Sequence, residues 1–165
     1  MVPLIKRLVA ALREELEQYG EMLARLDEQQ EMVMRREADG VLQSVESVQV
    51  QSLAIQRARE ERERRQAELA GSPGLPACTD FATLIPCLPS DYGLLVSALV
   101  QENNQLLVRV QQRARQNHML LAQSLELMGR MMKTLFPGSD LRTYTAGGTT
   151  SQNAPSGFSL YQAVG

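Results

Sequence analysis

Aromatic side chains, histidine and cysteine are scarce in this chain of 165 residues, of which 4% are aromatic and none is tryptophan. A compact globular core of this size usually holds more large aromatic side chains. With a single histidine, His118, no pair of histidines can hold a metal ion. Cys78 and Cys87 have no histidine or cysteine cluster nearby, so we predict reduced thiols and no zinc site. We therefore expect no metal, no cofactor and no enzyme activity.

Long hydrophobic runs and an excess of charge of one sign are also missing. No stretch approaches the roughly 20 apolar residues of a membrane span. Lys6 and Arg7 interrupt the apolar N-terminus, which is therefore not typical of a signal peptide. The net charge of -2 provides no field that would gather nucleic acid or anionic lipid. The sequence predicts a cytoplasmic protein with no nucleic-acid partner and no membrane span.

The chain does have the composition of long helices, with leucine, valine, methionine and alanine beside abundant glutamate, arginine and glutamine. Apolar residues recur three or four positions apart from residue 4 to residue 36, which predicts a first helix over residues 3–37. The pattern resets near residue 39, and Asp39 is a candidate N-cap for a second helix over residues 40–70.

The second helix changes character along its length. Its predicted apolar stripe consists of Leu42, Val45, Val48, Leu53 and Ile55. Beyond this stripe, the run QRAREERERRQAELA alternates arginine with glutamate at spacings that pair on a helix surface. We interpret this run as a solvated helix end. We also expect the carboxylates of the chain to lie on charged helix faces, where nothing raises their pKa.

A connector over residues 71–89 begins with closely spaced glycines and prolines, which stop the second helix. Within this connector we predict one or two helical turns, capped by Thr79 or Asp80. The side chains expected to cover the end of the bundle are Phe81, Leu84 and Ile85.

The third helix is predicted over residues 90–136 and carries two asparagines, Asn103 and Asn117, within its apolar stripe. A buried asparagine fixes the register between helices at some cost in stability. The alternative is that both side chains lie at the edge of the stripe and meet water. The sequence leaves these two interpretations open.

Three long helices with one apolar stripe each must bury those stripes together. The predicted fold is all-α, an elongated antiparallel three-helix coiled-coil-like bundle over residues 1–136 with a disordered tail over residues 137–165. The tail has too few apolar residues to offset the entropy of ordering. Its sizeable apolar residues are Tyr144, Phe158, Leu160 and Tyr161.

The last turns of the third helix carry more apolar surface than one stripe needs. Two lines of leucine and methionine together cover roughly half of the helix circumference, whereas a core-facing stripe needs about 100°. The excess is covered either by the rest of this chain, such as residues 79–89, or by the helix of another protein. Methionine favours the second explanation, because it adapts to irregular partner surfaces. The candidate binding residues are Leu120, Leu121, Leu127, Met128, Met131 and Leu135.

Taken together, these parts resemble the FlgN-type flagellar export chaperones. The long first helix, the arginine-rich end of the second helix (RAREERERR) and the asparagine-leucine element QENNQLL in the third helix are similar to that family in layout. The tail element YTAGG, residues 144–148, resembles the Tyr-x-Ala-x-Gly element that follows the last helix in the family.

The resemblance implies a function and a set of partners. Such chaperones bind the C-terminal helices of hook-associated proteins, prevent their premature assembly and deliver them to the flagellar type III export gate. The third helix is then the client-binding element, and Tyr144 is the residue implied to dock on the cytoplasmic domain of the export gate. The chaperone itself neither binds nor hydrolyses ATP.

Two other functions remain open from the residues alone. The chain is alternatively a structural coiled-coil adaptor that self-associates through the same surface. A further alternative is a phosphorelay bundle that uses His118, although the sequence NHMLLAQSL lacks the lysine and glycine that such a motif places after its histidine. The sequence does not tell which hook-associated protein is bound, with what stoichiometry, whether the free protein is monomeric, or what residues 158–164 do.

Overall fold

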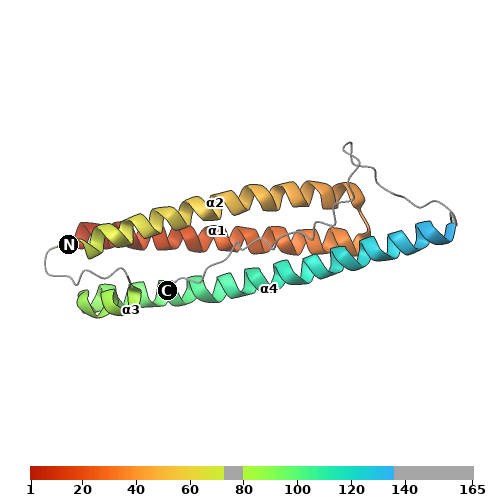
Figure 1. Ribbon diagram of the computed structural model, residues 1–165. Coiled ribbons are helices and arrows are strands. Elements are labelled where there is room, and N and C mark those ends of the chain that lie inside the picture. Colours follow the sequence, from red (N-terminus) through yellow and green to blue (C-terminus); the bar gives the residue numbers. More distant parts are fainter. Residues whose placement is uncertain (73–79, 136–165) are drawn as a thin grey trace, which may run out of the picture.

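The computed structural model describes residues 1–72 and 80–135, and the regular elements within these ranges are helices. They are α1 (Val2–Arg35), α2 (Ala38–Ala70), the short α3 (Phe81–Leu84), the 3-10 helix η1 (Ile85–Cys87) and α4 (Ser90–Leu135). The three long helices lie side by side in an elongated bundle (Figure 1). The prediction of an all-α three-helix bundle is confirmed, and residues 137–165 lie outside the described part of the chain.

The turn between α1 and α2 is short and uses the left-handed region of the backbone. Arg36 adopts this conformation, with φ 60°, and donates its backbone N–H to the carbonyl of Val33. The N–H of Glu37 bonds to the carbonyl of Met32, so the last carbonyls of α1 find partners. Asp39 lies inside the first turn of α2, because the cap residue is Glu37, and the predicted N-cap at Asp39 is therefore wrong.

α1 is the central helix of the bundle. It packs against both α2 and α4, whereas the backbones of α2 and α4 approach each other far less closely (Figure 1). α2 runs antiparallel to α1, and α4 runs parallel to it. The parallel register is fixed, since Asn103 bonds to the carbonyl of Leu12 and Asn117 to that of Leu26, with the same offset of 91 residues in both pairs.

Asn103 and Asn117 are buried, so the interpretation that placed them at a wet edge is wrong. Each side-chain amide donates to an α1 carbonyl, at 3.0 Å for Asn103 and 2.7 Å for Asn117. Each donates a second hydrogen bond, Asn103 to the carbonyl of Leu99 and Asn117 to the side-chain oxygen of Gln29. Because a parallel shift of α4 would leave these donors unpaired, the asparagines favour a single register.

The apolar core is divided into two clusters. One cluster lies where α3 and η1 close the bundle, and the prediction that Phe81 and Leu84 cover this end is confirmed. Asp80 caps α3 by accepting a hydrogen bond from the N–H of Ala82. The buried residues of this first cluster are Ile5, Leu8, Val9, Leu12, Leu69, Phe81, Leu84, Leu88, Val96 and Leu99. The second cluster, nearer the hairpin turn, consists of Tyr19, Met22, Leu26, Ile55, Leu107 and Val110.

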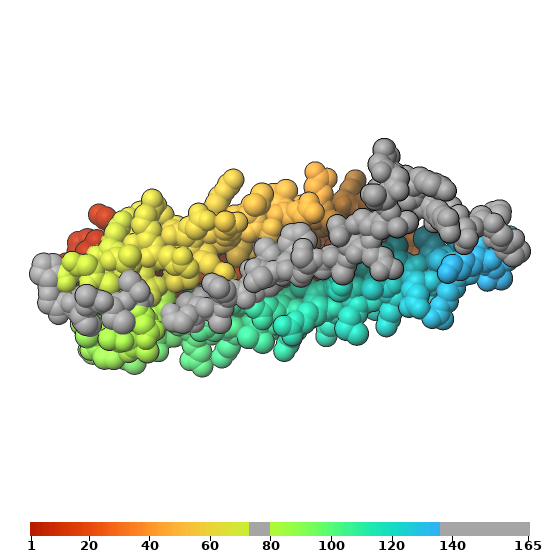
Figure 2. All heavy atoms as spheres, viewed as in Figure 1, coloured from red at the N-terminus to blue at the C-terminus, as the bar shows by residue number. Residues whose placement is uncertain are grey.

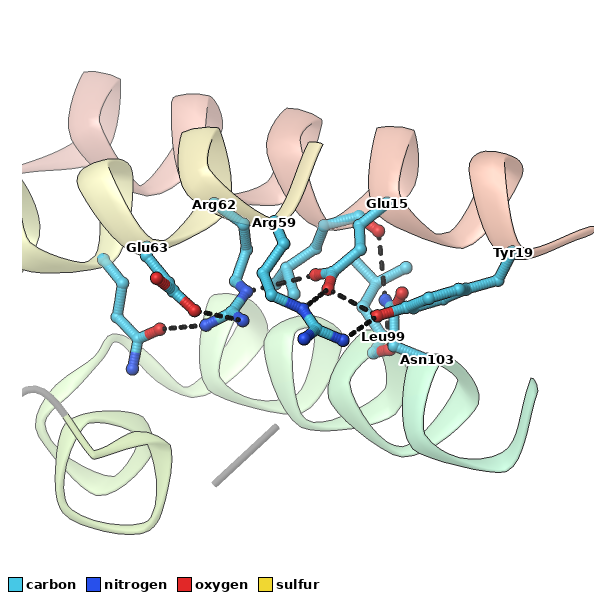
Figure 3. A network of polar contacts seen from close by, with 9 residues as sticks. Glu15, Tyr19, Arg59, Arg62, Glu63, Leu99 and Asn103 are labelled. Carbon is cyan, nitrogen blue, oxygen red and sulfur yellow. Dashed lines mark hydrogen bonds and ion pairs between the residues drawn. The ribbon is translucent and has the colours of Figure 1, made fainter. Parts of the chain in front are cut away.

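A layer of buried polar side chains lies between the two clusters (Figure 3). Glu15 is fully buried and accepts hydrogen bonds from the hydroxyl of Tyr19 at 2.9 Å and from Arg62 at 3.1 Å. Arg59 donates to the hydroxyl of Tyr19 at 3.0 Å, and the guanidinium of Arg62 lies over the ring of Phe81. The arginine-glutamate run is therefore not simply a solvated helix end, because Arg62 turns into the core to pair with a buried carboxylate.

This polar layer shifts the titration of its tyrosine. Burial, together with the charge of Glu15, raises the pKa of Tyr19 to about 12, although the nearby Arg59 acts in the opposite direction. The expectation that every carboxylate lies on a solvated face is also wrong, since Glu15 is enclosed by the bundle.

The predicted apolar stripe of α2 is largely wrong. Leu42, Val45 and Leu53 are exposed, and Ile55 is the residue of that stripe that is buried. Gln51 shows why, because its amide donates to the carbonyl of Gln18 at 2.9 Å and so places a polar face against α1. The buried polar residues of α2 are Ser44, Gln51, Arg62 and Gln66.

Candidate functional site

The candidate functional site is the end of α4 that extends beyond the hairpin. Carried to the end of α1, the offset of 91 residues that relates the two helices places Arg35 level with Glu126. α4 continues to Leu135, so its last turns have no α1 beside them. Figures 1 and 2 show this end of α4 projecting past the turn between α1 and α2.

Many of the exposed side chains of this segment are apolar. Leu125 is 70% exposed, Met128 64% and Leu135 67%, although the same stripe of α4 is buried further back at Val110. The helix thus keeps its core pattern after its neighbour has ended. We call the apolar residues of this part of α4 its open end. Those level with the last residues of α1 are Leu120, Leu121 and Leu125, and those beyond the end of α1 are Leu127, Met128, Met131, Met132 and Leu135.

The structure brings the six predicted binding residues together at this open end. Leu120 and Leu121 are half-buried near the end of the hairpin, and the other four are exposed. The predicted set omitted Leu125 and Met132, which are also exposed. Their signal was present in the sequence, because both continue the apolar stripe of α4 at helical spacing.

The described part of the connector, residues 71–72 and 80–89, does not cover the excess apolar surface of α4. α3 and η1 pack at the opposite end of the bundle, where Gly93 lies close enough to the carbonyl of Ile85 that an added Cβ would stand 3.2 Å from it. The hairpin does not wrap the residues of α4 beyond Glu126 either, since α1 ends level with that residue. Neither of these intramolecular explanations accounts for the apolar surface at the open end.

The remaining chemistry of the described residues is limited. Residues 1–72 and 80–135 contain no group of three or more histidine, cysteine or acidic side chains placed to hold a metal ion. Within the same ranges, no helix combines the length and apolarity needed to cross a membrane. His118 lies exposed on the surface of α4. Tyr144, the residue predicted to dock on the export gate, lies outside the described residues, as does the whole element around it.

A bundle whose described residues leave the apolar end of one helix uncovered has the form of a helical protein-binding protein. The chain belongs to the FlgN family, since the family model described as FlgN protein matches residues 1–152. The resemblance seen in the sequence is thereby confirmed, and the family is one of flagellar export chaperones. Searches of curated proteins and of solved structures give no match to this chain.

Proposed function

We propose that this export chaperone acts in the cytoplasm on hook-associated proteins. It binds the C-terminal helical segments of these clients, prevents their premature assembly and delivers them to the flagellar type III export gate. The observation that carries the proposal is the open end of α4, where exposed leucines and methionines continue a stripe that is buried elsewhere in the same helix. An exposed apolar stripe on a helix is the complement of an amphipathic helix.

The chemistry of the open end suits a chaperone that must release its client. Burial of apolar surface supplies affinity without a directional bond, and methionine side chains adapt to different helices. The described part of the open end has no aromatic side chain, and aromatic anchors are what commonly make an interface very tight. A leucine-methionine surface therefore favours binding that remains reversible at the export gate.

The six predicted residues, Leu120, Leu121, Leu127, Met128, Met131 and Leu135, are proposed to contact the client. Tyr144 is proposed to dock on the cytoplasmic domain of the export gate, and this role rests on the tail element shared with the family. The two roles occupy different segments of the chain, so each can be removed without the other.

Co-purification with the C-terminal segments of hook-associated proteins tests the proposal. We expect the wild type to capture a segment, Leu127→Asp/Met131→Asp to lose it, and Tyr144→Ala to keep it. A matched control is Gln123→Asp/Gly129→Asp, which adds the same charge off the apolar face, where a side chain at Gly129 would meet no atom within 4 Å. This control is expected to retain the segment.

Two results would count against the proposal. Equal loss of capture in the matched control would show that added charge, not the apolar face, decides binding. Failure of every form to bind any segment, together with a stable homo-oligomer, would instead support the structural coiled-coil adaptor.

A further inference from the structure

The open end of α4 presents two lines of apolar side chains, not one. At about 100° per residue, the line Leu121, Leu125, Met128, Met132 and Leu135 continues the side of α4 that faces α1 in the bundle. The second line, Leu120, Leu127 and Met131, lies beside it. Beyond Glu126, where α1 has ended, the two lines together span about 140° of the helix.

In the other helices of this protein, the angular width of the buried face can be compared with the number of helices packed against it. In α1, which packs against both α2 and α4, the buried residues from Ile5 to Gln29 span about 160°. In α2, which packs mainly against α1, those from Ser44 to Leu69 span about 80°. Between Asn103 and Asn117, where α4 has passed the closed end, its buried residues also span about 80°. At about 140°, the apolar surface of α4 beyond Glu126 is therefore closer in width to the buried face of α1, which has two neighbours, than to the 80° faces that pack mainly against one helix.

The positions of the charged residues in this segment are also consistent with two neighbouring helices. Glu126, Arg130 and Lys133 lie together on the remaining side of the helix, opposite the apolar lines. Arg130 donates to Glu126 at 2.5 Å, so this strip pairs within itself. Two helices packed on the apolar lines would leave the strip in water.

We infer that the open end of α4 binds two helices of one partner side by side, as α1 does within the bundle. The inference rests on the proposed function and extends it from one client helix to two. Each partner helix needs an aliphatic seam along a segment of about 14 Å, the length of residues 127–135 at 1.5 Å per residue, because α1 still lies beside α4 up to Glu126. Its charged residues would face away from α4. The inferred ligand is thus a pair of amphipathic helices.

A second copy of this chain fits the open end less well. Within residues 1–72 and 80–135, a second copy has one projecting helix end that could pack here, because its own α1 and α2 are already packed together and end at their turn. One helix covers one line and leaves the other in water. A single client helix would likewise leave one of the two apolar lines in water.

The methionines of the chain are native reporters for each line. Met128 and Met132 mark the line that continues toward α1, and Met131 marks the second line. Met119 lies on the opposite side of α4, and Met22 is fully buried in the bundle, so these two serve as references. The full-length protein with carbon-13 methyl-labelled methionine would be titrated with a hook-associated protein, first as its isolated C-terminal helix and then as the full-length chain. Access of a soluble paramagnetic probe to each methyl group is the readout.

The full-length client is expected to shield Met128, Met131 and Met132 together, with Met119 and Met22 unchanged. It is also expected to bind at least about tenfold more tightly than the isolated helix, and Leu127→Asp should weaken its binding by a similar factor. Shielding of one line alone, with equal affinity for the two client forms, would overturn the inference and leave the proposed function standing.

Two other results of the methyl measurement would assign the second apolar line to a different occupant. Shielding that appears in the free protein and grows with its concentration would assign the second line to a second copy. Shielding of Met131 in the free protein at every concentration would assign that line to the chain's own tail. Either result overturns the inference. No change at any methyl group with either client form would overturn the inference and the proposed function together.

Discussion

The two ends of α4 carry similar side chains in opposite surroundings. At its first turns, Val96 and Leu99 are buried in a cluster to which α1, α2 and α3 contribute. At its last turns, Leu127 and Met128 occupy an equally regular pattern and are exposed. The difference arises from where the neighbouring helices end and not from the residues of α4. The comparison teaches that an apolar pattern shows what must be covered, while the lengths of the neighbours decide whether the chain covers it itself.

The largest expected difference between the two ends is in their tolerance of charge. Leu84→Asp places an unpaired carboxylate in the closed cluster and is expected to cost about 4 kcal/mol or more of the free energy of unfolding. Leu127→Asp at the open end is expected to change it by less than about 0.5 kcal/mol. Urea denaturation of both variants is the measurement. Comparable losses in the two would show that the open end is part of the folded core.

A smaller loss in the free energy of unfolding is expected from a substitution in the polar layer that separates the two clusters. Glu15→Ala leaves the guanidinium of Arg62 buried without its carboxylate, which is expected to destabilise the protein by about 3 kcal/mol. Glu14→Ala is the control, because the neighbouring Glu14 is exposed and accepts a hydrogen bond from Gln18 of the same helix. Thermal unfolding compares the two. A Glu15→Ala protein as stable as the control would mean that the polar layer contributes little to the closed part of the bundle.

Tyr19, in the same polar layer, is expected to make the free energy of unfolding depend on pH in one direction. The folded-state pKa of Tyr19 is about 12, above the value of about 10 expected in the unfolded chain. As pH rises through this window the unfolded chain loses the proton first, so the free energy of unfolding falls between about pH 10 and pH 12. Urea denaturation at several pH values should show a smaller fall in Tyr19→Phe. An identical fall in both proteins would assign the effect to other groups.

The smallest expected effect lies at the turn where the hairpin ends and the open end of α4 begins. Arg36→Gly relieves the left-handed conformation of residue 36 and is expected to stabilise the protein by about 0.5–1 kcal/mol. Arg35→Gly, one residue earlier and inside α1, is expected to destabilise it by a similar amount. The shift in unfolding midpoint measures both, and a loss of stability in Arg36→Gly would contradict the account of this turn.

Much of the fold was predictable because local chemistry determines it. Apolar spacing and the glycines and prolines after residue 70 placed the long helices to within a few residues. The packing face of α2 was not predictable from apolar residues, since Gln51 and Arg62 bury polar groups whose partners lie on another helix. The burial of Asn103 depended on a carbonyl 91 positions away.

The candidate site was predictable in part for a related reason. The excess of apolar residues near the end of α4 is local and therefore visible in the sequence. The absence of α1 beside the last of them depends on the register between α1 and α4, which the side chains of Asn103 and Asn117 reveal. The gate-docking role of Tyr144 stays a prediction, because it rests on a short sequence element alone.

Hydrogen exchange of the free protein and of its client complex tests the central claim most directly. The account predicts that client binding slows exchange in residues 120–135 and leaves residues 81–99 at the closed end unchanged. Slower exchange at the closed end, or along α2, with no change in residues 120–135 would contradict it, because the client would then bind a surface other than the open end of α4.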